Sequence, residues 1–143
     1  MENDFKLSKS SKKNLSGIDS RLIKLVGRVI KKSPFDFGIP EYGGFRTPQE
    51  QNNLYHRRPK VTHIDGFKKK SYHQTGNAFD IFIYFEGRAR WDNPKQYEAV
   101  WECIKDEFGL MQDEGIFEKD EEIQWGGNWK RFKDYPHFQI ICR

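Results

Sequence analysis

Apolar residues recur every three or four positions in two stretches of the chain, and this period predicts amphipathic helices. The first stretch, residues 16–32, ends shortly before Pro34, which cannot continue a helix. The second stretch, residues 94–108, ends before Gly109, a residue type that commonly follows the last helical turn. We therefore expect one helix in each stretch.

A third helix is predicted by its first residues. Thr47 can cap the helix, Pro48 suits its first position, and Glu50 can reach back to close a capping box. We expect this helix to run to about residue 57. The next residues, 58–72, contain a proline, a glycine and three consecutive lysines, and we expect them to form a long exposed loop.

Continuous apolar runs predict the strands. Residues 77–85 are apolar at seven of nine positions, which indicates a central strand that is covered on both faces. Three further short strands are predicted within residues 35–45, 123–125 and 137–141. The segment between the last helix and the first of the two C-terminal strands, residues 109–122, is expected to be an acidic connector.

Length and composition limit this picture further. The 143 residues fit one domain, so we expect residues 1–143 to form a single α+β unit, with about three helices on a small, largely antiparallel sheet. The polar residues 1–15 are expected to be a loosely packed arm. Cys103 and Cys142 form no CxxC motif, which favours free thiols in a reducing compartment.

The charge and the N-terminus suggest where the chain acts. A formal net charge of +4 favours anionic polymers, although the basic and aromatic residues form no RNA-binding motif, so we expect no nucleic-acid partner. No signal peptide and no transmembrane stretch is recognisable. We expect a monomer that is made in the cytoplasm and does not insert into a membrane.

Two short segments carry the residues that are best suited to chemistry. The first contributes His73 and Asp80, and the second, near the C-terminus, contributes Asp134 and His137. Two imidazoles and one carboxylate can hold a zinc ion and leave one position open, while the second carboxylate can act as a base. Ala78 would share a strand face with Asp80 and leave room for a metal and a substrate.

Each of these residues also has an ordinary structural explanation. A lone histidine before a strand is more often hydrogen-bonded or solvated than a ligand. Asp80 needs a partner, because a buried carboxylate is costly unless it is paired or bound to a metal, and Arg46 or a lysine could supply the pair. Only the four positions together favour a metal site. His56 and His63 lack such neighbours and are expected to be surface residues.

The two segments share one pattern of spacing, which is Ser71-x-His73-x-x-Gly76-x-Ala78-x-Asp80 followed by Asp134-x-x-His137. Three further motifs accompany them, namely Leu15-Ser16-Gly17-Ile18, Gly44-Phe45-Arg46-Thr47 with Gln51, and Trp125-Gly126-Gly127-x-Trp129. In this order the motifs resemble the D-alanyl-D-alanine carboxypeptidase family of zinc metallopeptidases, over most of the chain. That family includes VanY-type carboxypeptidases, VanX-type dipeptidases and phage endolysins that are L-alanyl-D-glutamate peptidases.

The resemblance implies a fold like that of the related hedgehog domain, with Zn²⁺ as the cofactor. It makes His73, Asp80 and His137 the zinc ligands. It makes Asp134 the general base and Arg46 the cation that stabilises the oxyanion. The residues that it suggests for contacts with the substrate are Ser71, Gln51 and Trp125.

The resemblance also implies the substrate, which is the stem peptide of bacterial peptidoglycan. The base position holds Asp, which is common in the endolysin branch, whereas the carboxypeptidases and dipeptidases typically have Glu. We therefore expect an L-alanyl-D-glutamate endopeptidase that acts on the wall as a phage endolysin in host lysis. Two alternatives stay open, a D,D-carboxypeptidase or dipeptidase on D-Ala-D-Ala termini and a zinc-containing binding domain without catalysis.

Overall fold

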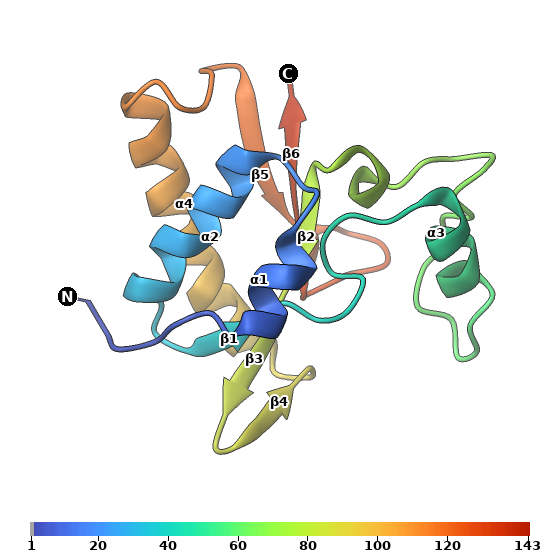
Figure 1. Ribbon diagram of the computed structural model, residues 1–143, viewed down its shortest axis with the longest axis horizontal. Helices are drawn as coiled ribbons and strands as arrows, with labels where there is room; N and C mark the ends of the chain where they lie inside the picture. Colours follow the sequence, from blue (N-terminus) through green and yellow to red (C-terminus); the bar gives the residue numbers. More distant parts are fainter. Residues whose placement is uncertain (1) are drawn as a thin grey trace.

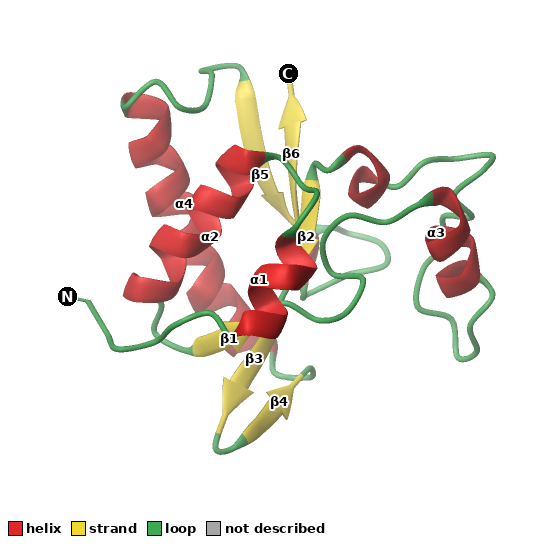
Figure 2. Cartoon of the chain, viewed as in Figure 1, coloured by secondary structure: helices red, strands yellow, loops and turns green. Residues whose placement is uncertain are grey.

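The computed structural model describes residues 2–143, and within them helices pack on two small antiparallel sheets (Figures 1 and 2). This arrangement confirms the predicted α+β class. The helices are α1 (Lys9–Leu15), α2 (Ser20–Lys32), α3 (Pro48–Tyr55), η1 (Tyr72–Thr75), α4 (Pro94–Asp113) and η2 (Gly126–Asn128), of which η1 and η2 are 3₁₀ turns. The strands are β1 (Asp36–Gly38), β2 (Ala78–Asp80), β3 (Phe82–Phe85), β4 (Arg88–Arg90), β5 (Glu121–Trp125) and β6 (His137–Cys142).

The sheet with strand order β2-β6-β5 separates the two halves of the molecule. Its register places Asp80 opposite His137 and Gln124 opposite Gln139. Figure 1 shows α2 and α4 on one side of this sheet, and α3 with its long loops on the other. The second sheet, with strand order β1-β3-β4, lies below the ends of α1 and α2 in this view.

One face of the β2-β6-β5 sheet forms the core with α2 and α4. Phe79 and Phe138 are at most 1% exposed, and their rings stack with centroids 5.4 Å apart. The apolar stripe that predicted α2 is buried as expected, and it consists of Leu22, Leu25, Val26, Val29 and Ile30. Because side chains alternate along a strand, the residues next to Phe79 and Phe138 point away from this core.

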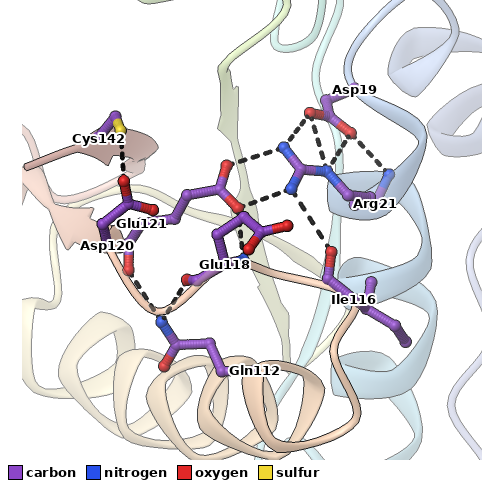
Figure 3. Close-up of polar contacts among 8 residues, drawn as sticks. All are labelled: Asp19, Arg21, Gln112, Ile116, Glu118, Asp120, Glu121 and Cys142. Atoms are coloured by element: carbon purple, nitrogen blue, oxygen red, sulfur yellow. Dashed lines mark hydrogen bonds and ion pairs between the residues drawn. The ribbon is translucent and has the colours of Figure 1, made fainter.

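A cluster of charges fixes the start of α2 against β5 (Figure 3). Asp19 caps the helix by accepting the backbone N–H of Arg21 at 2.8 Å. The guanidinium of Arg21 also donates to Glu121 at 2.7 Å, which joins the first turn of α2 to the first residue of β5. Gln112, near the end of α4, donates to the backbone oxygen of Glu121 at 2.9 Å. Both long helices are therefore tied to the same end of one strand.

The prediction of a single strand over residues 77–85 is wrong. The segment forms β2 and β3, which belong to different sheets, and Ile81 lies between them with its N–H bonded to the oxygen of Pro136 at 2.9 Å. Tyr84 and Phe85 in β3 are 46% and 39% exposed, so the segment is not covered on both faces. Both halves are apolar, and the composition therefore gave no sign of the break.

The helix boundaries also differ from the prediction in three places. Helix α2 begins at Ser20 and not at residue 16, because Asp19 caps it. The expected arm, residues 1–15, contains α1, whose Leu15 is 1% exposed in the core. Helix α4 continues past Gly109 to Asp113 because the next turn buries Met111, which is 0% exposed. Burial of a large side chain outweighs the cost of about 1 kcal/mol for a glycine inside a helix.

Two local predictions are confirmed, one for the start of α3 and one for the loop that follows this helix. The capping box of α3 is formed, since Thr47 Oγ1 accepts the N–H of Glu50 at 3.1 Å and Glu50 accepts the N–H of Thr47 at 2.8 Å. Residues 58–71 form neither helix nor strand. Within residues 2–143, no helix has both the length and the apolar character that a membrane span needs.

Candidate metal centre

Three potential ligand atoms converge on the polar face of the β2-β6-β5 sheet. His73 Nε2 lies 3.2 Å from His137 Nδ1 and 3.2 Å from Asp80 Oδ1, and the last two atoms are 3.0 Å apart. Three ligands that each stand about 2.0–2.2 Å from one ion have separations close to these. The structure thus brings together the three ligands that the sequence predicted.

Local structure explains why these side chains meet. His73 lies in η1, and Ser71 begins this turn by accepting the N–H of His73 at 3.2 Å. Gly76 ends the turn with a φ of 75°, a left-handed conformation that favours glycine, and the chain then enters β2. Asp80 and His137 face each other because they are paired across β2 and β6.

A second hydrogen bond on each histidine determines which ring nitrogen faces the centre. His73 Nδ1 lies 2.8 Å from the oxygen of Gly44, which can only accept, so this nitrogen carries the proton. His137 Nε2 lies 2.7 Å from Gln139 Oε1, and the amide nitrogen of Gln139 donates to Gln124 Oε1 at 3.2 Å. When both histidines are neutral, three lone pairs face one another, and a bound cation fits this donor set.

Burial and charge set the protonation of these groups. Burial is the main cause that lowers the pKa of His73, which is 2% exposed. For Asp80 burial acts in the opposite direction, but His73, His137 and Arg46 outweigh it and hold the pKa well below its usual value. Burial would lower the pKa of His137, yet its contact with Asp80 raises it, so a metal would compete with a proton there.

Arg46 is anchored beside the centre by three contacts. Its Nη2 donates to Asp80 Oδ2 at 3.0 Å, its Nε to the oxygen of Tyr42 at 2.7 Å, and its Nη1 to Gln51 Oε1 at 3.0 Å. The pair between Arg46 and Asp80, one of the partners considered from the sequence, is therefore present. It occupies one carboxylate oxygen and leaves Oδ1 for the centre.

The three residues expected to contact the substrate are buried in this structure. Gln51 is 0% exposed, and its amide nitrogen donates to the oxygen of Ile64 at 2.9 Å. Ser71 is 6% exposed within its turn. Trp125 is 3% exposed, and its indole N–H donates to the oxygen of Tyr135 at 2.7 Å. Their hydrogen bonds support the loops around the centre. Residue type alone does not show whether such a residue supports a loop or contacts the substrate.

Asp134 brings a free carboxylate to the same region. Burial and the negative charge of Asp80 raise its pKa to about 6. Its backbone is fixed, since its N–H donates to the oxygen of Gly126 at 3.0 Å and its own oxygen accepts the N–H of His137 at 3.1 Å. A side chain at Gly126 would meet the oxygen of Asp134 at 2.3 Å, so this position requires glycine. A carboxylate of this pKa suits a general base near neutral pH.

Sequence reasoning missed one neighbour of His137. Gln139 follows it by two positions on β6 and so lies on the same face, a signal that was available from strand alternation. The ring of Trp129, which belongs to the motif that precedes the last predicted ligand, lies 5.3 Å from that of His137. His56 and His63 are exposed, as predicted.

The sequence is similar to those of two named peptidases. The chain is 34% identical over 102 residues to the peptidoglycan L-alanyl-D-glutamate endopeptidase CwlK of Bacillus subtilis, a match that covers 68% of this chain and 58% of CwlK. It is 32% identical over 133 residues to the L-alanyl-D-glutamate peptidase of Escherichia phage T5, covering 92% of this chain and 86% of that protein.

The fold has a counterpart among solved structures. The L-Ala D-Glu endopeptidase ChiX of Serratia marcescens superposes with a TM-score of 0.71 at 24% identity, over 96% of this chain and 92% of ChiX. This likeness supports the architecture described above. Residues 3–140 match the sequence profile of the phage L-alanyl-D-glutamate peptidases, and the chain belongs to this family.

Proposed function

We propose that the protein is a zinc-dependent endopeptidase that cleaves the L-alanyl-D-glutamate bond in the stem peptide of bacterial peptidoglycan. The observation that carries the proposal is the convergence of His73, Asp80 and His137 within 3.2 Å of one another, beside the free carboxylate of Asp134. The names of CwlK and of the phage T5 peptidase support this bond and polymer. The phage relative also supports a role as an endolysin, which acts on the wall after release.

His73, Asp80 and His137 would hold the zinc ion. When bound, the ion supplies a Lewis acid and an acidified water for attack on the scissile carbonyl. Asp134 accepts the proton of that water on its carboxylate and passes it to the leaving amine. All three guanidinium nitrogens of Arg46 already donate hydrogen bonds within the protein, and one of these bonds positions Asp80. Arg46 would therefore stabilise the oxyanion through its positive charge and not through a hydrogen bond.

The test is mass spectrometry of the fragments that the protein releases from purified peptidoglycan, with Asp134→Ala as the control. Cleavage at the proposed bond leaves L-alanine on the glycan strand and frees the amino group of D-glutamate. Release of free D-alanine would instead identify a carboxypeptidase. Zinc binding without release of any fragment would identify a binding domain without catalysis. Either of these results would contradict the proposal.

A further inference from the structure

Two loops beside the metal centre concentrate positive charge. We define the first basic loop as residues 57–70, with six Lys or Arg against one Asp, and the second basic loop as residues 130–133, with three Lys or Arg and no acid. All nine cations are exposed. Within residues 2–143, none of the nine forms an ion pair with a carboxylate. They are Arg57, Arg58, Lys60, Lys68, Lys69, Lys70, Lys130, Arg131 and Lys133.

The far side of the β2-β6-β5 sheet differs in charge. Residues 98–122, which include most of α4, contain ten Asp or Glu against two Lys. There Arg28 pairs with Glu114 at 2.9 Å, and Lys32 pairs with Glu107 at 2.6 Å. The two basic loops alone carry a net charge of +8, twice the +4 of the whole chain, so the surface that they form is strongly positive.

The two basic loops form one surface around the centre. Their contact is between the rings of His63 and Phe132, whose centroids are 4.1 Å apart. Gln51 holds the first basic loop, because it donates a hydrogen bond to the oxygen of Ile64 and accepts one from Arg46. The second basic loop leads directly into Asp134. Whatever binds this surface therefore lies beside the metal centre.

The same surface also exposes apolar side chains. The three most exposed large hydrophobic residues of the described chain lie on these loops, Phe132 at 70%, Phe67 at 61% and Val61 at 56%. Phe132 has a φ of 53°, a backbone conformation that is rare for residues other than glycine and that often marks functional sites. Apolar groups exposed among charges are typical of interaction surfaces.

We propose that the two basic loops bind the peptidoglycan polymer outside the scissile peptide. Lys and Arg would contact the carboxylates of neighbouring stem peptides, and Phe67 and Phe132 would lie against the sugar rings. The inference rests on the proposed function for the identity of the polymer. A polymer that is itself the substrate can contact this surface and the metal centre at the same time, whereas a membrane surface would compete with the substrate for the same side of the molecule.

The test compares two triple variants that remove the same charge. In the first, Lys68, Lys69 and Lys70 are replaced by Gln, and in the matched control the exposed lysines of α1, at positions 9, 12 and 13, are replaced by Gln. Each set lowers the net charge from +4 to +1. Binding to purified peptidoglycan sacculi is measured by sedimentation, with Asp134→Ala present in both proteins to prevent digestion.

We expect the loop variant to bind sacculi about tenfold more weakly at low salt, and the α1 variant to change less than about twofold. The difference should disappear at about 0.5 M salt, because screening removes charge attraction over these distances. Equal binding by the two variants would overturn the proposal. Stronger binding of the parent protein to vesicles of phosphatidylcholine and phosphatidylglycerol than to sacculi would also overturn it, since a membrane would then be the partner.

A second measurement separates this inference from the proposed function. Both triple variants, now with Asp134 intact, are assayed on a soluble stem peptide and on sacculi. We expect the loop variant to lose about tenfold in the rate on sacculi and to keep its rate on the soluble peptide. An equal loss on both substrates would show that the lysines act on the scissile peptide itself and would contradict the proposal. Lack of hydrolysis of the soluble peptide by the wild type would contradict the proposed function alone.

Discussion

The two faces of the β2-β6-β5 sheet use neighbouring residues of the same strands in different ways. On one face Phe79 and Phe138 lie in the core and are at most 1% exposed. On the other face Asp80 and His137, each adjacent in sequence to one of these phenylalanines, point to the candidate metal centre. Strand alternation thus lets a packed core hold the ligands in fixed positions. It also predicts that substitutions on the two faces have separable effects.

The largest effect is expected from Asp80→Asn on the polar face. Asn keeps the shape of the side chain and a contact with Arg46, but it removes the charge that a zinc ligand needs. We expect the variant to lose zinc and at least about a thousandfold in activity, because the Lewis acid and the acidified water are lost together. Metal analysis and the rate on a stem peptide check this, and retained zinc with full activity would contradict it.

The next largest effect is expected from Asp134→Asn, which should keep zinc and lose about 10²–10⁴ in turnover. The wild-type rate should fall as the pH drops through about 6, because the raised pKa leaves Asp134 protonated and unable to accept a proton below that value. A bound cation would lower the pKa of Asp134 and so move this fall in rate to lower pH. The rate–pH profiles of both proteins test the assignment, and an unchanged rate in the variant would remove Asp134 as the base.

On the core face, Phe138→Ala should lower the free energy of unfolding by about 3–5 kcal/mol, because it empties a fully buried site between the sheet and the helices. Urea unfolding of the metal-free proteins compares this variant with Asp134→Asn on the polar side, where the raised pKa shows that the fold does not stabilise the carboxylate charge. We expect the latter to change stability much less. If both substitutions destabilised the protein equally, the two faces would not be separable.

The smallest effect is expected from Gln139→Leu, which removes the acceptor for His137 Nε2. Loss of such a supporting contact typically weakens metal binding by about 10–100-fold, because the ring tautomer and orientation are no longer fixed. Gln139→Glu, which retains an acceptor, serves as the matched control. Chelator competition measures zinc affinity for both, and equal affinities would show that Gln139 does not position His137.

The sequence predicted those parts of the structure that depend on local chemistry. The capping box of Thr47 and Glu50 is set by residues close in the chain, whereas the three distant ligands were predicted from their chemistry and from the resemblance of their motifs. The turn at Ile81 could not be predicted, since it is stabilised by a bond to Pro136, far away in the sequence. Likewise, only the packed structure shows that Gln51 is buried behind Arg46.

We expect His73, Asp80 and His137 to bind one catalytic zinc ion, and metal analysis combined with an activity assay measures this. The purified protein should contain about one zinc per chain, since three protein ligands make a single site. Removal of the zinc by a chelator should abolish hydrolysis of the stem peptide, and added zinc should restore it. Metal-free protein that keeps full activity would contradict the account.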